Sequence, residues 1–127
     1  MVSKDIQDKI EKYFETLKNN TLKIVNKLEK EIEMLKKRNV KVVTIGISDP
    51  DGRIMDINEC YVDSPEECED IARKCIFDKD KDACKKIRYN EKLTEICQEL
   101  EETLGTLGQE VCIMIFEEYG IKTTFYA

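Results

Sequence analysis

The sequence predicts an α+β fold: an antiparallel sheet of two β-hairpins packs in a two-layer sandwich with a long N-terminal helix and a cysteine-rich central helical hairpin. Three observations lead to this prediction. Apolar residues recur at helical spacing over residues 3–38, a turn sequence at 49–52 separates two alternating runs, and apolar runs fill residues 110–127. The expected order of elements is α-ββ-αα-ββ, within a single domain over residues 1–127.

Residues 3–38 are expected to form one long helix, because their apolar side chains lie three or four residues apart, as in a coiled-coil seam. Such a helix would be roughly 50 Å long at 1.5 Å per residue, longer than a compact domain of this size. Part of it is therefore expected to pack on a second copy of the chain. The candidate residues of this dimer seam are Ile10, Phe14, Leu17, Ile24 and Leu28. Two shorter helices, broken near Asn19–Thr21, are the alternative.

Two β-hairpins are expected, at residues 40–62 and 110–127. In the first, Val43, Ile45 and Ile47 alternate with smaller residues, and Asp-Pro-Asp-Gly at 49–52 has the residues that a tight turn prefers. In the second, residues 110–118 are apolar on both faces, which is typical of a central strand. A short turn then leads into a last strand at 121–126.

The region between the hairpins, residues 64–104, is expected to be helical and rich in cysteine. Ser64-Pro65-Glu66-Glu67 has the composition of a helix start, with a capping Ser, a Pro at the first helical position and a Glu three residues after the cap. A polar loop at 78–82 separates this helix from a further helix, or a pair of helices broken at Tyr89-Asn90, that runs to Leu104 and is stopped by Gly105 and Gly108.

Six cysteines are the main chemical feature of the chain: Cys60, Cys68, Cys75, Cys84, Cys97 and Cys112. No C-x-x-C pair occurs, so the spacing does not favour a zinc or thioredoxin-like site. A helical hairpin around residues 78–82 would bring Cys75 opposite Cys84, so we predict that disulfide, with Cys68–Cys97 as the next pair. Cys112 is expected to be a buried thiol. A metal or iron–sulfur site at the four central cysteines, or redox chemistry at Cys60 or Cys112, are the alternatives.

Composition narrows the possible functions. The net charge is −6, which argues against a general nucleic-acid binder. The absence of His excludes a Ser-His-Asp triad and His-ligated metals. We therefore predict no catalytic, cofactor or metal residues. No long apolar run or secretory leader occurs, so a cytoplasmic protein is expected. Lys and Glu enrichment together with cysteines favours a hyperthermophilic archaeon, or one of its viruses, as the source. A mesophile with an AT-rich genome, which would give a similar Lys, Ile and Asn bias, is the alternative.

Three stretches also resemble the roadblock/LC7 family of longin- and profilin-like α/β domains: the helix and first strand, the Asp-Gly turn with its return strand, and the C-terminal apolar segments. They fall within residues 22–60 and 90–127. The chain departs from that family in its cysteine-rich stretch at 60–90 and in its extra N-terminal segment. The resemblance implies a non-enzymatic homodimer that acts as a scaffold or on a small GTPase. Together, these features predict a small, homodimeric interaction protein stabilised by disulfides.

Overall fold

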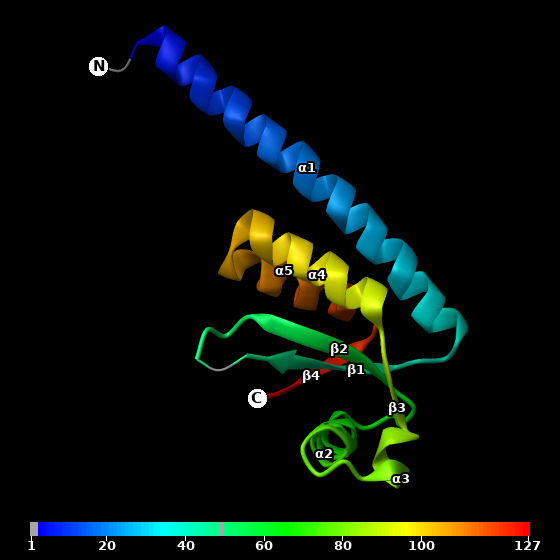
Figure 1. Cartoon of the computed structure of the whole chain (residues 1–127). Helices are drawn as coiled ribbons and strands as arrows, with labels where there is room; N and C mark the ends of the chain where they lie inside the picture. Colours follow the sequence, from blue (N-terminus) through cyan, green and yellow to red (C-terminus); the bar gives the residue numbers. More distant parts are fainter. Residues whose placement is uncertain (1–2, 49) are drawn as a thin grey trace.

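The computed structural model describes residues 3–48 and 50–127 (Figure 1). The predicted α+β class is confirmed, since five helices and four strands are described. In chain order they are α1 (Lys4–Lys37), β1 (Val42–Ile47), β2 (Ile54–Cys60), α2 (Pro65–Ile76), α3 (Lys81–Cys84), β3 (Ile87–Tyr89), α4 (Glu91–Leu104), α5 (Thr106–Glu118) and β4 (Lys122–Tyr126).

Helix α1 is continuous over 34 residues, so the alternative of two shorter helices is not adopted. Its first turn is capped by Ser3, whose hydroxyl accepts a hydrogen bond from the backbone N–H of Ile6 at 3.4 Å. At the suspected break, the Thr21 hydroxyl donates to the Leu17 carbonyl at 2.8 Å. The polar side chain is thus satisfied inside the helix, and the helix passes through this point unbroken.

The four strands form one sheet in the order β3-β2-β1-β4. The first predicted hairpin is confirmed: β1 and β2 are antiparallel, with Ile45 opposite Ile57. In its turn, Gly52 has a φ of 68° and donates its N–H to the Ser48 carbonyl at 2.7 Å. A residue with a side chain would be strained at this φ. Asp49, part of the predicted turn, lies outside the described residues.

The second predicted hairpin is wrong. Residues 106–118 form helix α5 instead of a strand, and they bury Gly108, Cys112, Ile115 and Phe116 at helical spacing. An apolar run that is buried on several sides does not distinguish a central strand from a core helix. Because α5 carries the chain back along the sheet, β4 does not pair with a neighbouring hairpin strand. It lies parallel to β1, so the sheet is mixed and not purely antiparallel.

Helices cover both faces of the sheet, so the fold has three layers and not the predicted two (Figure 1). One apolar core joins Val43, Ile45 and Ile57 to α1, α4 and α5. A second core joins Val42, Cys60 and Tyr126 to α2, α3 and β3. Val42 and Val43 are neighbours on opposite faces of β1, and both are fully buried. A sheet with apolar residues on both faces needs a cover on each.

The expected helical hairpin over residues 64–104 is also corrected. Strand β3 interrupts this region, and it pairs with β2 through Ile87 and Cys60. Helix α2 then lies on one face of the sheet, while α4 lies on the other. The predicted start of α2 is confirmed, because the Ser64 hydroxyl accepts the Glu67 N–H at 3.3 Å. Each helix has its own apolar face, and one layer could not bury both.

Candidate interaction surface

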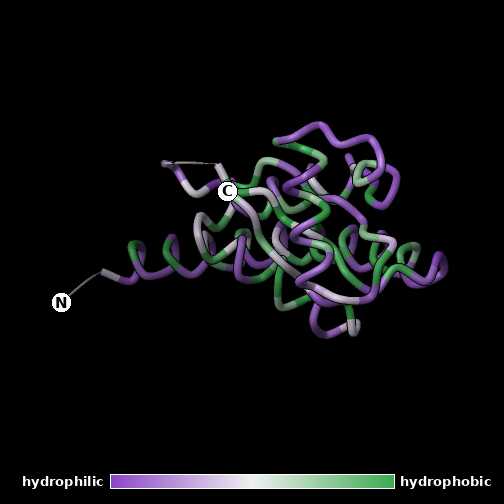
Figure 2. The backbone as a smooth tube through the Cα atoms, turned by 90° about the horizontal axis from the view of Figure 1, so that it is seen from below, coloured by the Kyte–Doolittle hydropathy of each residue, from purple (hydrophilic) through white to green (hydrophobic). Residues whose placement is uncertain are grey.

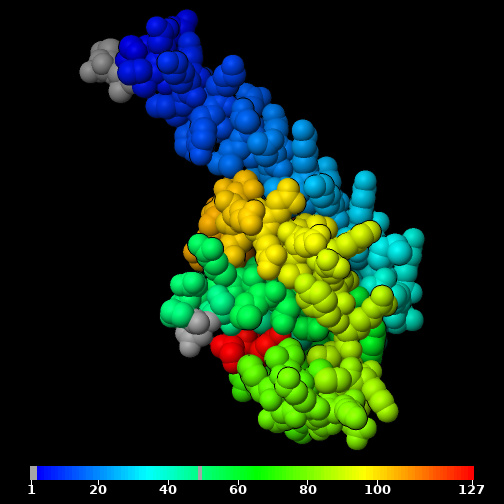
Figure 3. Space-filling view, viewed as in Figure 1, coloured from blue at the N-terminus to red at the C-terminus, as the bar shows by residue number. Residues whose placement is uncertain are grey.

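The N-terminal half of α1 extends beyond the rest of the molecule, as the ribbon and the space-filling view both show (Figures 1 and 3).

Helix α4 runs antiparallel to α1, as two ion pairs between them show. Near the start of α4, Lys92 pairs with Glu31 at 3.6 Å. Further along α4, Glu99 pairs at 3.8 Å with Lys27, which comes earlier in α1 than Glu31. Near the C-terminal end of α4 lies a hollow of about 340 Å³ beside α1. It is lined by Asn20, Lys23, Ile24, Lys27, Glu99 and Thr103.

The C-terminal half of α1 packs on α4 and α5 through one apolar stripe. Its buried residues are Ile24, Leu28, Ile32 and Leu35. Polar contacts flank the stripe: the Tyr119 hydroxyl donates to the Glu29 carboxylate, and the Lys36 ammonium lies 6.0 Å from the centre of the Tyr119 ring. The hydrogen bond to Glu29 is the main cause that raises the pKa of Tyr119 to about 12. We call this half, residues 24–37, the packed half.

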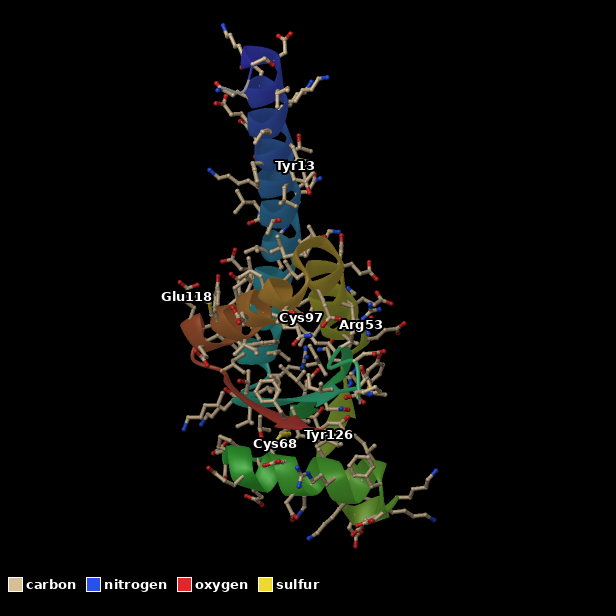
Figure 4. All side chains as sticks on the ribbon, turned by 90° about the vertical axis from the view of Figure 1, so that its left-hand side faces the viewer. Tyr13, Arg53, Cys68, Cys97, Glu118 and Tyr126 are labelled. Carbon is tan, nitrogen blue, oxygen red and sulfur yellow. A yellow bond between two sulfur atoms is a disulfide. The ribbon has the colours of Figure 1, made fainter. Side chains whose placement is uncertain are left out.

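The remaining part of α1 continues the same stripe, and no other helix or strand of the described residues buries it. Ile6, Ile10 and Phe14 are exposed by 51%, 48% and 60%, and Leu17 is partly exposed. Tyr13 lies beside Phe14, with their rings 5.5 Å apart, and it stands clear of the other elements (Figure 4). We call residues 4–19 the projecting half, and Ile6, Ile10, Phe14 and Leu17 the projecting stripe. In Figure 2, hydrophobic segments, drawn in green, recur along the projecting half of α1.

The structure divides the predicted dimer seam into two parts. Ile10, Phe14 and Leu17 lie on the projecting stripe, where a partner can reach them. Ile24 and Leu28 are buried in the chain's own core, at 5% and 0% exposure. The prediction is wrong for these last two residues, because α4 and α5 already occupy that part of the seam. Sequence reasoning missed Ile6, which has the same helical spacing.

The two halves of α1 are copies of one pattern. Each residue of the projecting stripe has an apolar counterpart 18 residues later in the packed half. Since an α-helix has 3.6 residues per turn, 18 residues make five full turns, and both sets lie on the same face. The charged residues beside the stripe repeat in the same way: Lys9, Glu11 and Lys18 correspond to Lys27, Glu29 and Lys36. Of the latter, Lys27 contacts α4, and the other two contact Tyr119 at the end of α5. The projecting half therefore has the side chains of a helix-packing surface.

A buried carboxylate on β2 is bonded to polar side chains from the ends of two helices. Glu59 on β2 has a side chain only 2% exposed, and it accepts hydrogen bonds from Arg38 and from the Asn90 amide at 2.9 Å. Arg38 contributes two bonds, from Nη2 at 2.8 Å and from Nε at 3.3 Å. Asn90 also caps α4 by accepting the Leu93 N–H at 2.9 Å. The cluster joins the ends of two helices to the sheet.

A second polar cluster lies between the sheet and α2. The Tyr126 hydroxyl donates to the Asp56 carboxylate, and Gly46 leaves the space that this pair fills, since a Cβ there would overlap both side chains. Burial, and then the bond to Asp56, raises the pKa of Tyr126 well above its usual range. Two buried atoms beside this pair, Thr44 Oγ1 and Asn58 Nδ2, have no hydrogen-bond partner among the residues that the structure describes.

A hollow of about 500 Å³ lies between the β1–β2 turn and the α4–α5 turn. Two of its polar side chains, Gln109 and Glu101, bond to each other and to the hairpin. Gln109 Nε2 donates hydrogen bonds to the Gly52 carbonyl, at 2.8 Å, and to the Glu101 carboxylate. The Glu101 carboxylate also accepts the Ile54 N–H at 3.2 Å. These bonds hold the hairpin against the helices.

All six cysteines are joined in disulfides. The predicted Cys75–Cys84 bond is confirmed, with Cα atoms 4.8 Å apart. The predicted Cys68–Cys97 pair is wrong, because these residues lie on opposite faces of the sheet (Figure 4). Cys68 bonds to Cys60 instead, and Cys97 bonds to Cys112 across the α4–α5 pair. Cys112 is buried as expected, but in a helix and without a free thiol.

These bonds argue against the metal alternative. Thiolates are the form of cysteine that binds zinc and iron–sulfur clusters, and none of the six is free. Among residues 3–48 and 50–127, no group of three Cys, Asp or Glu side chains could hold a metal ion. None of the helices in the described part of the chain combines the length and apolar composition that a membrane crossing needs.

Comparisons with known proteins add no assignment: no family model, no curated protein and no solved structure matches the chain. The projecting stripe is thus the feature of the molecule that most needs a functional explanation. Exposed apolar residues are common singly, but a contiguous stripe of them is typical of a surface that binds another protein.

Proposed function

We propose that the protein is a non-enzymatic interaction or scaffold protein, and that it forms a homodimer through the projecting stripe of α1. One observation carries this proposal: the stripe that buries Ile24 to Leu35 continues, with the same spacing, past the end of the body. Isolated helices in water depend on tertiary packing of an apolar face for most of their stability. A projecting helix with such a face is best explained by a partner that covers it.

The rest of the molecule supports a scaffold function. Glu59, Asp56 and Glu101 are three carboxylates of the body that are each bonded to other groups of the chain. A catalytic carboxylate needs a substrate within reach of its oxygen atoms. Three disulfides add rigidity to the body. The resemblance to roadblock/LC7 domains favours the same class of function, a non-enzymatic homodimer.

Sedimentation equilibrium over a range of concentrations tests the proposal. The Ile10→Asp variant places a charge in the centre of the projecting stripe, and it should shift the protein to monomer. Leu22→Asp is the matched control: Leu22 is on the same helix and is equally exposed at 48%, but it lies outside the stripe, about 120° around the helix from Ile10. A wild-type chain that remains a 14.8 kDa monomer at every concentration would refute self-association.

We also propose, as a separate matter, that the protein acts in the cytoplasm of a hyperthermophile or of a virus that infects one. Its support is the combination of Lys and Glu enrichment with three disulfides, since intracellular disulfides are common in such organisms. An extracellular or other oxidising setting explains the disulfides equally well. The oxidised protein should unfold above about 90 °C, and a midpoint in the mesophilic range would contradict a hyperthermophilic source.

A further inference from the structure

The direction in which two copies of α1 can pair follows from where the body lies. The projecting stripe and the packed half share one face of the helix, so α4 and α5 occupy the line along which the stripe continues. In a parallel pair, the partner's helix would have to run along this line into the body. In an antiparallel pair, the partner's helix ends where the body begins. Sterics therefore favour the antiparallel order.

The length of the projecting half fits this order. If two copies are related by a two-fold axis near Phe14, the partner's first turn lies level with Thr21–Ile24. At this level, the hollow lined by Asn20, Lys23, Ile24 and Glu99 leaves space beside α1. Ile10 of each copy then lies against Leu17 of the other, and the two Phe14 side chains meet at the axis. An interface of this kind is isologous and closes at two subunits.

The charges that flank the stripe are complementary in the same order. Glu11 and Lys18 lie on one side of the stripe, seven residues apart, and they are at similar distances from Phe14. An antiparallel pair places Glu11 of each copy beside Lys18 of the other, which gives two ion pairs related by the axis. The antiparallel order also sets the two helix dipoles in opposition, which is their favourable arrangement. In a parallel pair, Glu11 and Lys18 of different copies do not face each other.

We infer that the second copy binds antiparallel, with Phe14 at the two-fold axis and reciprocal Glu11–Lys18 ion pairs between subunits. This inference rests on the proposed homodimer and specifies its geometry. The two bodies then lie at opposite ends of the paired helices, and the dimer is an elongated rod with a body at each end. Such a dimer would hold its two bodies at a fixed separation.

A charge exchange between subunits tests the geometry. Glu11→Lys brings two lysines together across the axis, and Lys18→Glu brings two glutamates together, so each variant alone should dimerise about 5-fold to 30-fold more weakly. When the two variants are mixed in equal amounts, every cross-subunit pair is again Lys with Glu. The mixture should therefore recover the wild-type dissociation constant as a heterodimer.

The control variant is Lys12→Glu, which makes the same change in net charge as Lys18→Glu but lies on the side of the helix away from the stripe. It should leave the dissociation constant within about 2-fold of wild type, a difference of less than 0.5 kcal/mol. Helicity measured by circular dichroism shows that each variant still forms α1. If the wild type dimerises but the mixture does not recover, the antiparallel order is refuted while the homodimer stands. A monomeric wild type refutes both.

Discussion

Arg38, which caps the C-terminal end of α1, donates two hydrogen bonds to the buried carboxylate of Glu59, at 2.8 and 3.3 Å. Glu59 lies on β2, so this pair links the end of α1 to the sheet on which α4 packs. A buried carboxylate without partners is costly, whereas one that is fully bonded is tolerated. The pair therefore fixes the direction in which α1 leaves the body, and with it the direction of the projecting half.

Arg38→Ala should lower the free energy of unfolding by about 2 to 3 kcal/mol, because it leaves the Glu59 carboxylate with Asn90 as its remaining side-chain partner. Urea unfolding measures the change. Lys37→Ala, at the adjacent exposed position, should change it by less than about 0.5 kcal/mol. Adding Glu59→Gln to Arg38→Ala removes the uncompensated charge and should recover part of the loss. Equal effects of Arg38→Ala and Lys37→Ala would contradict a structural role for the pair.

The disulfides should be reduced in a definite order. Cys75 and Cys84 are both partly exposed, whereas the other four cysteines are at most 1% exposed. A reductant must reach a sulfur atom to open a bond, so the Cys75–Cys84 bond should open first under native conditions. Stepwise reduction with a phosphine, followed by alkylation and peptide mapping, measures the order. Early labelling of Cys97 or Cys112 would show that α4 and α5 separate more easily than their packing indicates.

Gly108 allows α5 to approach α4 closely. A Cβ at this position would overlap the backbone carbonyl of Leu100. Gly108→Ala should therefore lower the free energy of unfolding by roughly 1 to 3 kcal/mol, even though Ala is the better helix former. Thr106→Ala, at an exposed position in the first turn of α5, is the control and should have little effect. A Gly108→Ala protein as stable as wild type would mean that α5 can shift away from α4 at no cost.

Stability should fall in alkaline solution, and Tyr119 should contribute to the fall. The pKa of Tyr119 is about 12 in the folded chain because of its bond to Glu29, whereas an unfolded tyrosine has a pKa of about 10. The contribution is fully present below pH 10 and is lost as the pH rises towards 12. Unfolding measured at intervals across this window should show a shallower fall for Tyr119→Phe. Tyr61→Phe, at an exposed position, should follow the wild type.

The sequence predicts the first half of this fold well. The continuous apolar spacing of α1, the turn before Arg53 and the cap at Ser64 are local signals, and each specifies its element without help from distant residues. The C-terminal half is different. Residues 110–118 read as a strand because every side chain from 111 to 116 is apolar, and only the three-dimensional surroundings of α5 explain that composition. Strand β3, with three residues, has no periodicity to detect.

The candidate surface was only partly predictable for a related reason. The spacing of the five seam residues, Ile10, Phe14, Leu17, Ile24 and Leu28, identifies one face of a helix. It does not show which of them are buried in the chain's own core and which are left for a partner. That boundary depends on the length of α4 and on the hairpin it forms with α5, which the sequence analysis missed. The 18-residue repeat was visible in the sequence. It would have shown that α1 has two equivalent packing segments.

The disulfide connectivity has a consequence for how the chain matures. The bonds join the first cysteine to the second, the third to the fourth and the fifth to the sixth, with separations of 8, 9 and 15 residues. Of the 15 ways to pair six cysteines, this one has three successive rings that neither overlap nor enclose one another. During synthesis from the N-terminus, both cysteines of each pair emerge before the first cysteine of the next pair. Oxidation in the order of synthesis would therefore give the native set without reshuffling.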